Sequence, residues 1–150
     1  MKQEDKDLLL RDLCARLPYG VKIKTSYNKM DEPIELRFIN PRNESFAIGS
    51  NFTLISGLDF DTYECKPYLF PLSSMTEEQR IEASFEFDSK KYKVNIFGDI
   101  ESYSEIGEDT AYIGLESIGR YIDWLNKNHF DYRGLIEKGL AIDCTNLNIY

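Results

Sequence analysis

The chain has 150 residues, 42% of them hydrophobic, and a formal net charge of −8. This length and hydrophobic content exclude a disordered chain and allow one domain with a buried core. The excess of negative charge repels phosphate backbones, which excludes general nucleic-acid binding.

The first predicted element is a helix over residues 5–17. Leu9, Leu13 and Leu17 recur at every fourth position, which forms an apolar stripe along one side of a helix. Pro18 ends the pattern, and Gly20 can adopt the positive φ of a following turn at little cost. We therefore expect an N-terminal helix and then a turn.

Four short strands are predicted between residues 21 and 60. Apolar and polar residues alternate in VKIKTSY and in IELRFI, where Ile34, Leu36 and Phe38 share one face. The longer segment FAIGSNFTLISGLDF has turn-forming residues at positions 49–51, so we expect two strands there. Four antiparallel strands in succession favour a meander or a small barrel.

The middle of the chain predicts a short helix followed by a hairpin. Thr76 and Gln79 have the spacing of a capping box, which begins a helix that ends near residue 83 or 84. Residues 85–96 then alternate on both sides of a turn at residues 88–90, which is typical of a hairpin. We expect this hairpin to continue the same sheet.

The last third of the chain is acidic. Between Lys93 and Arg120 there are six acidic residues and no basic one, so an acidic loop is predicted before a helix over residues 111–127. The apolar face of that helix consists of Leu115, Ile118, Ile122 and Leu125, with Tyr121 and Trp124 at its flanks. Residues 139–150 alternate again and predict an edge strand.

Together these elements predict an α+β fold in a single domain over residues 1–150. In this prediction, an antiparallel sheet or small barrel packs against the N-terminal helix, a short middle helix and a longer C-terminal helix.

The cysteines and the apolar runs bear on location. Cys14, Cys65 and Cys144 are odd in number and far apart, which fits neither a disulfide framework nor a zinc spacing. The N-terminus has no signal-peptide core, and no run approaches the roughly 18 residues of a membrane span. We expect a cytoplasmic protein without membrane contact.

Motifs for catalysis are missing from the sequence. His129 is the only histidine, which excludes two-histidine metal sites, and a pairing of His129 with Cys144 would rest on residue types alone. Neither a phosphate-binding loop nor G-x-G-x-x-G occurs. We expect no enzymatic activity, no metal and no cofactor.

Asp59 and Asp61 are the candidate carboxylate pair. Alternation would place them on one face of a strand with Glu64 nearby, which is the arrangement that glycosidases and hard-cation sites need. The alternative is a solvated strand face.

The string NHFDYRGLIEKGLA, residues 128–141, has the composition of a binding loop. The candidate ligand or partner contacts in it are His129, Asp131, Tyr132 and Arg133. We favour a structural alternative, in which this corner joins a helix to its tail and Arg133 pairs with Asp131 or Asp123.

Three strings stand in order along the chain: LPYGVK from Leu17, KPYLFPLSSMTEE from Lys66, and IDWLNKNHFDYRGLIEKGLA from Ile122. They resemble an uncharacterised family of small proteins from gut anaerobic bacteria and from their phages and prophages. The family usually has an arginine where this chain has Phe70, so no role is carried over to that position. The resemblance implies a phage or mobile-element setting and no established activity, substrate or cofactor.

Three functions follow as hypotheses. The first is a non-enzymatic accessory protein that binds another protein through the C-terminal corner or through an acidic surface made of Asp99, Glu101, Glu105, Glu108 and Asp109. The alternative is a protein that binds a small ligand such as a nucleotide signal, with stacking on Tyr68 and Tyr132 and a phosphate on Arg133. The third is a carboxylate-based hydrolase at Asp59 and Asp61. The sequence leaves a homo-oligomer open.

Overall fold

The computed structural model describes residues 1–27, 32–50, 53–87, 90–95, 98–103 and 115–150. The chain forms two compact units, each with its own hydrophobic core. Unit 1 consists of Met1–Leu69 and Arg133–Tyr150, and unit 2 consists of Phe70–Tyr132. The mixed α+β content is as predicted, and a single domain over the whole chain stays a prediction.

Unit 1 is built from one helix, one 3-10 turn and six described strands. They are α1 (Gln3–Arg16), η1 (Leu17–Tyr19), β1 (Lys22–Thr25), β2 (Ile34–Asn40), β3 (Ser45–Ser50), β4 (Thr53–Asp59), β5 (Cys65–Pro71, whose last two residues belong to unit 2) and β10 (Ile142–Asp143). Unit 2 contains η2 (Leu72–Ser74), α2 (Glu77–Ala83), β6 (Phe85–Phe87), β7 (Lys90–Val94), β8 (Ile100–Tyr103), α3 (Leu115–Lys127) and β9 (Phe130–Asp131).

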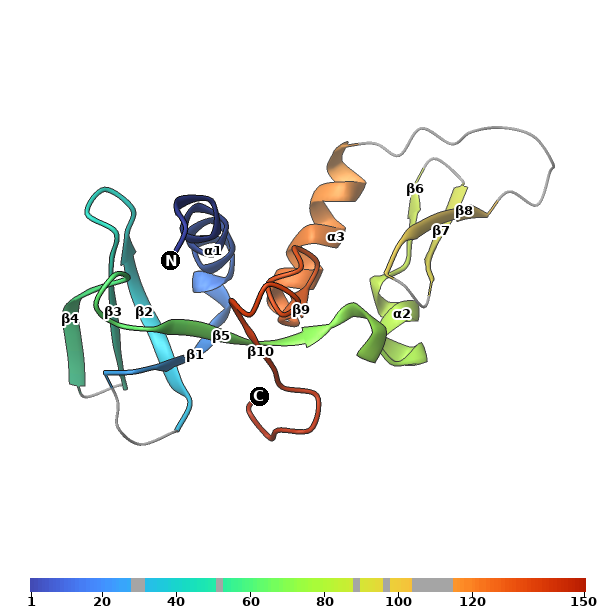
Figure 1. Cartoon of the computed structure of the whole chain (residues 1–150). Helices are drawn as coiled ribbons and strands as arrows, with labels where there is room; N and C mark the ends of the chain where they lie inside the picture. Colours follow the sequence, from blue (N-terminus) through green and yellow to red (C-terminus); the bar gives the residue numbers. More distant parts are fainter. Residues whose placement is uncertain (28–31, 51–52, 88–89, 96–97, 104–114) are drawn as a thin grey trace. The chain divides into compact units, whose positions relative to one another are not determined.

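Helix α1 forms the main helical layer of unit 1. Its stripe of Leu9 and Leu13 is fully buried in one core with residues from every strand between β1 and β5. The helix ends at Arg16, and η1 carries the chain through Pro18 to Gly20, whose φ is +69°. The predicted helix and turn are confirmed, and Figure 1 shows α1 along one side of the strands.

The sheet of unit 1 is open and mixed. Its strand order is β10-β5-β1-β2-β3-β4, with β9 pairing further along β5. Neighbours from β5 to β4 are antiparallel, whereas β10 runs parallel to β5. Because this strand order has two ends, the sheet is not closed, and the small barrel considered from the sequence is wrong. The parallel β10 also means that the sheet is not purely antiparallel. The edge strand predicted in the last residues is present as β10.

A β-bulge in β2 changes which face of the sheet Phe38 occupies. The pairing of β2 with β3 shifts between Leu36 and Phe38, which makes Arg37 an extra residue. Leu36 and Ile39 are therefore buried, while Phe38 is 53% exposed. The prediction that Phe38 shares a face with Leu36 is wrong, because alternation is interrupted at the bulge.

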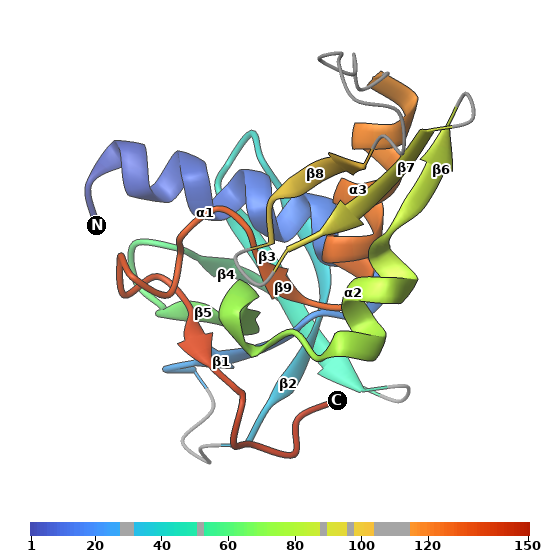
Figure 2. The same ribbon diagram turned by 90° about the vertical axis from the view of Figure 1, so that its right-hand side faces the viewer.

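Unit 2 has a separate sheet of its own. Thr76 and Gln79 form the predicted capping box, with each side chain bonded to the other residue's backbone N–H, and α2 ends at Ala83. The helix leads directly into β6 of the antiparallel sheet β6-β7-β8 (Figure 2). The hairpin is confirmed, but it does not continue the sheet of unit 1. Strand β8 lies where an acidic loop was predicted.

Helix α3 packs in the core of unit 2, and the predicted packing of this helix on the main sheet stays a prediction. Tyr121 and Leu125 are buried in the core of unit 2. The Tyr121 hydroxyl donates to the Gly98 carbonyl over 2.8 Å, so Tyr121 is a core residue and not a flanking one. Trp124 stacks on Phe130, with ring centroids 5.6 Å apart. Of the three described helices α2 is the shortest, as predicted, with seven residues. Residues 111–114, with which the predicted C-terminal helix begins, lie outside the described residues.

Candidate protein-binding surface

Strand β4 ends the sheet of unit 1 and has one side free among the described strands. It is seven residues long and pairs with β3 only. Its sequence, TLISGLD, contains no lysine, arginine or proline, and residues 53–58 carry no charge. Sheets usually protect an exposed edge with charged side chains, proline or a short strand. Of these protections β4 has none along residues 53–56.

The outer face of the sheet next to this edge carries two exposed apolar side chains. Ile55 and Leu58 point into the core beneath α1, so alternation turns Leu54 to the opposite face. Leu54 is 64% exposed, and Phe38 lies on the same outer face. We call the free backbone edge of β4, with Thr53, Leu54, Ser56 and Phe38, the β4 edge surface.

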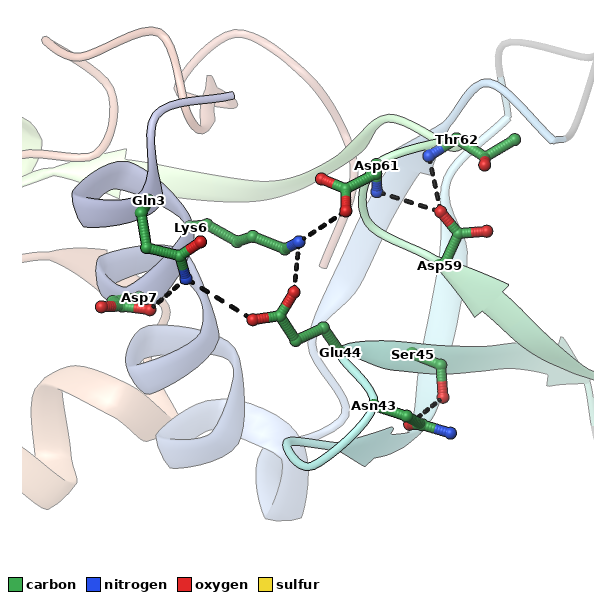
Figure 3. Close-up of polar contacts among 9 residues, drawn as sticks. All are labelled: Gln3, Lys6, Asp7, Asn43, Glu44, Ser45, Asp59, Asp61 and Thr62. Atoms are coloured by element: carbon green, nitrogen blue, oxygen red, sulfur yellow. Dashed lines mark hydrogen bonds and ion pairs between the residues drawn. The ribbon is translucent and has the colours of Figure 1, made fainter.

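A charged cluster fixes the far end of β4 to α1. The buried Lys6 ammonium donates to Asp61 over 2.9 Å and pairs with Glu44 in the turn between β2 and β3 (Figure 3). Glu44 has a φ of +50°, and its carbonyl accepts from Phe60 N–H over 3.2 Å. The bonds to Glu44 and Asp61 raise the pKa of Lys6. The cluster therefore holds both turns around the end of β4 in place.

The predicted carboxylate pair belongs to this cluster but is arranged as a turn. Asp59 accepts backbone N–H bonds from Thr62 over 2.7 Å and from Asp61 over 3.1 Å. The bond from Thr62 is the main cause that lowers the pKa of Asp59. A general acid needs a raised pKa, which is opposite to the shift at Asp59. The carboxylate of Asp61 pairs with Lys6, and that of Glu64 pairs with Lys66. The two aspartates have different structural partners and do not form a paired site.

The C-terminal corner consists mostly of backbone connections. His129 is buried with a φ of +60°; its N–H donates to Asn126 and its carbonyl accepts from Phe70 N–H over 2.9 Å. Asp131 is buried in β9, and the Tyr132 hydroxyl donates to Asn126 Oδ1 over 3.2 Å. This burial agrees with the structural alternative and leaves His129 and Asp131 little surface for a partner.

Arg133 makes an ion pair that the sequence did not predict. Its Nε lies 3.7 Å from Asp12 Oδ1, and Asp12 also binds Arg16, with 2.8 Å from Arg16 Nε to Oδ2 and 3.0 Å from Nη2 to Oδ1. The side chains of Asp12 and Arg16 are both 0% exposed. The arginine therefore links the returning segment of unit 1 to α1. Its predicted pairing with Asp131 or Asp123 stays a prediction.

The predicted acidic surface falls largely outside the described residues. Glu105, Glu108 and Asp109 lie outside them, and of Glu101 only the backbone in β8 is described. Asp99 is exposed, and its N–H donates to Asn95 Oδ1 over 2.9 Å. The predicted acidic surface therefore stays a prediction.

Other candidate ligand sites have less support. Tyr68 is only 5% exposed, and Tyr132 and Arg133 belong to different units. A hollow of about 400 Å³ in unit 2 is lined by Glu77, Arg80, Ile81, Ser84 and Val94. Two of its three polar side chains already bind the backbone, since Arg80 donates to the Met75 carbonyl and Ser84 to the Arg80 carbonyl.

Metal ligands and membrane helices are not found in the part of the chain that the structure describes. Within it, no three histidine, cysteine, aspartate or glutamate side chains gather as a metal site. None of the helices there has the length and apolar character needed to cross a bilayer.

The β4 edge surface was not predicted from the sequence, for two reasons. The alternation of TLISGLD predicts a strand but gives no indication that this strand is last in the sheet. Phe38 was expected to share a face with Leu36, because nothing in IELRFI signals the bulge at Arg37. The one available signal was the lack of charge in residues 53–58.

Comparison of the chain with protein-family models, with curated proteins and with solved structures finds no match in any of the three.

Proposed function

We propose that this chain is a non-enzymatic protein that acts by binding another protein, and that the β4 edge surface makes the contact. The observation that carries the proposal is an uncharged, unprotected edge strand beside the exposed Leu54. An extended segment of a partner can add to such an edge as a further strand, in which main-chain bonds give affinity and side-chain contacts give specificity.

The geometry suits strand addition because the edge is held by its neighbours. Strand β4 pairs with β3 along its length, and the Lys6 cluster anchors the turn that follows Asp59. A preordered strand loses little conformational freedom when a partner binds. Each new main-chain bond is worth only about 0.5–1.5 kcal/mol, so a short added strand needs the apolar contact at Leu54 as well.

The setting we propose comes from the family resemblance and from the lack of catalytic motifs in the sequence. A phage or mobile-element accessory protein in the cytoplasm acts by contact with a component of the host cell. The small-ligand and hydrolase alternatives have weaker support in the described residues, because Tyr68 is buried and Asp59 is engaged in a turn.

The test is capture of a partner from the lysate of a gut anaerobic bacterium by the tagged chain. Leu54→Lys places a protective charge on the edge, whereas Ile81→Lys makes the same change at a residue of unit 2 that is 67% exposed. We expect a captured protein that is lost with Leu54→Lys and kept with Ile81→Lys.

Three results would count against the proposal. Equal capture by all three proteins would show that the β4 edge surface is not used, and no capture above background would remove the support for protein binding. Loss with Ile81→Lys alone would move the contact to the hollow beside α2. Both substitutions are at exposed positions, so the free energy of unfolding should change by no more than about 0.5 kcal/mol.

A further inference from the structure

We propose that a second copy of this chain binds to the β4 edge, so that two β4 strands pair antiparallel around a two-fold axis at Leu54. The inference rests on the proposed use of the β4 edge surface and names one occupant for it. Identical strands related by a two-fold axis perpendicular to a sheet run antiparallel, which is the geometry of an extended continuous sheet.

The side-chain faces of the two copies match in this register. With the axis at Leu54, each Leu54 lies opposite its own equivalent, and Thr53 lies opposite Ile55 of the second copy. Leu54 is on the outer face of the sheet in both copies, and Thr53 and Ile55 are on the inner face in both. The two exposed leucines then cover each other as a cross-strand pair.

The lack of charge along this edge permits self-pairing. Residues 53–58 are uncharged, and Asp59 falls beyond the paired residues, so no like charges face each other across the ladder. The whole chain nevertheless carries −8, so two copies repel at long range. Salt should therefore strengthen this association, whereas it should weaken the binding of a basic partner.

The bulge in β4 sets the size of the contact. The pairing of β3 with β4 shifts between Phe46 and Ile48, and Gly57 has a φ of +77°. A bulge bends the strand and interrupts regular pairing, so the straight part of the edge ends near Ser56. With the axis at Leu54, the contact comprises about three residues on each copy, which is smaller than a standard stable interface, so the dimer is in exchange with the monomer.

Sedimentation of the whole chain from micromolar to millimolar concentration tests the association. We expect the average mass to rise toward that of a dimer, and to do so at lower concentration as NaCl rises from about 0.1 M to about 1 M, where the screening length falls from about 10 Å to about 3 Å. Leu54→Lys should weaken the association at least about tenfold, as a charge opposite its own copy does. Ile81→Lys should leave it unchanged.

A cross-linking experiment tests the register. In a background with the exposed Cys14 replaced by serine, Leu54→Cys places two cysteines opposite each other, with Cα atoms about 4.5–5.5 Å apart. That separation is within the roughly 4.4–6.8 Å that a disulfide spans. Oxidised glutathione, which supplies the oxidant, should link these copies. Ser56→Cys should not link, because its equivalents lie four residues apart along the strands, or about 13 Å.

A wild-type chain that stays monomeric at every concentration and salt would overturn the inference. So would equal association by wild type and Leu54→Lys, or cross-linking by Ser56→Cys and not by Leu54→Cys. A monomer whose capture of a host protein still depends on Leu54 would keep the proposed function and reject self-pairing. A chain that dimerises through β4 but captures no host protein would keep self-pairing and reject the proposed function.

Discussion

The two edge strands of the unit 1 sheet, β10 and β4, differ in length and in their contacts with the rest of the chain. At one end, β10 is two residues long, and the chain beyond it is bonded back to the sheet by Cys144 N–H to the Leu69 carbonyl over 3.0 Å. At the other end, β4 is seven residues long and exposes Leu54 beside a free backbone. We call the β10 side of this sheet the closed edge and the β4 side the open edge, and we place binding at the open edge.

Tyr150 shows how the closed side is held. Its hydroxyl accepts from Lys22 N–H over 3.1 Å and donates to the Tyr68 carbonyl over 3.0 Å, so it bridges β1 and β5. The ion pair of Arg133 with Asp12 holds the start of the same returning segment against α1. The closed edge therefore depends on side chains far apart in the sequence, whereas the open edge is held mainly by the neighbouring strand β3, and only its end is tied to α1 through the Lys6 cluster.

The largest effect expected from breaking the closed side comes from Asp12→Ala. This change leaves the fully buried Arg16 without the carboxylate that it binds twice, and it also removes the partner of Arg133. Loss of one member of a buried ion pair typically costs about 3–5 kcal/mol. Urea unfolding followed by circular dichroism should show a loss of that size.

Asp7→Ala is the matched control, because Asp7 is an exposed acid on the same helix that accepts one bond from Gln3. It should change the free energy of unfolding by no more than about 0.5 kcal/mol. Equal effects of the two substitutions would show that the buried pair does not hold the closed side.

Gly49→Ala should destabilise the open edge more than Leu54→Lys does. A Cβ at Gly49 would lie 2.0 Å from the Thr53 carbonyl oxygen, which forces β3 and β4 apart at the start of the edge. Overpacking of this kind costs about 1–3 kcal/mol. Gly119→Ala in α3 is the control, since no atom lies within 4 Å of its new Cβ, and alanine should stabilise that helix by up to about 1 kcal/mol. Calorimetric melting of both variants measures the opposite signs, and a neutral Gly49→Ala would contradict the close approach.

The smallest effect is expected for Tyr150→Phe, which removes both bonds of the hydroxyl and should cost about 1 kcal/mol at neutral pH. Desolvation raises the pKa of Tyr150, although part of its ring is exposed. A raised pKa means that the folded chain holds this proton more tightly, so the stabilisation is complete below the ordinary pKa of 10.0 and is lost as the pH rises above it. The variant should therefore lose less stability than wild type in alkaline solution.

Tyr27→Phe provides the comparison for this prediction. Tyr27 is exposed to a similar extent, and its edge-on contact with Tyr63 is one that phenylalanine retains. Unfolding of the three proteins at neutral and alkaline pH should show a change for Tyr150→Phe alone. An identical pH dependence of all three would show that Tyr150 does not bridge the strands.

Local features of the fold were predictable from the sequence, and the features that distinguish the two edges were not. The capping box of Thr76 and Gln79 and the leucine stripe of α1 are set by residues three or four positions apart, and both were found. The parallel pairing of Ile142 with Tyr68 and the assignment of α3 to unit 2 depend on contacts between distant segments. Alternation also fails at Arg37, where a single extra residue reverses the face of Phe38.

At the candidate site, too, contacts between distant segments could not be predicted from the sequence. A structural corner at residues 128–141 was favoured from the sequence, and the burial of His129 and Asp131 is compatible with it. The Asp12 partner of Arg133 was not expected, because Asp12 is remote from Arg133 in sequence.

The discontinuous make-up of unit 1 has a consequence for synthesis on the ribosome. Unit 2 is one continuous stretch and can fold as soon as it emerges, whereas β5 must wait for β10. At about 5–20 residues per second, the chain between Pro71 and Ile142 takes several seconds to make. During that interval the nascent chain exposes the side of β5 that β10 later covers, as well as β4. A chaperone that shields strand edges would therefore matter most in this window, before Ile142 and Asp143 have been added.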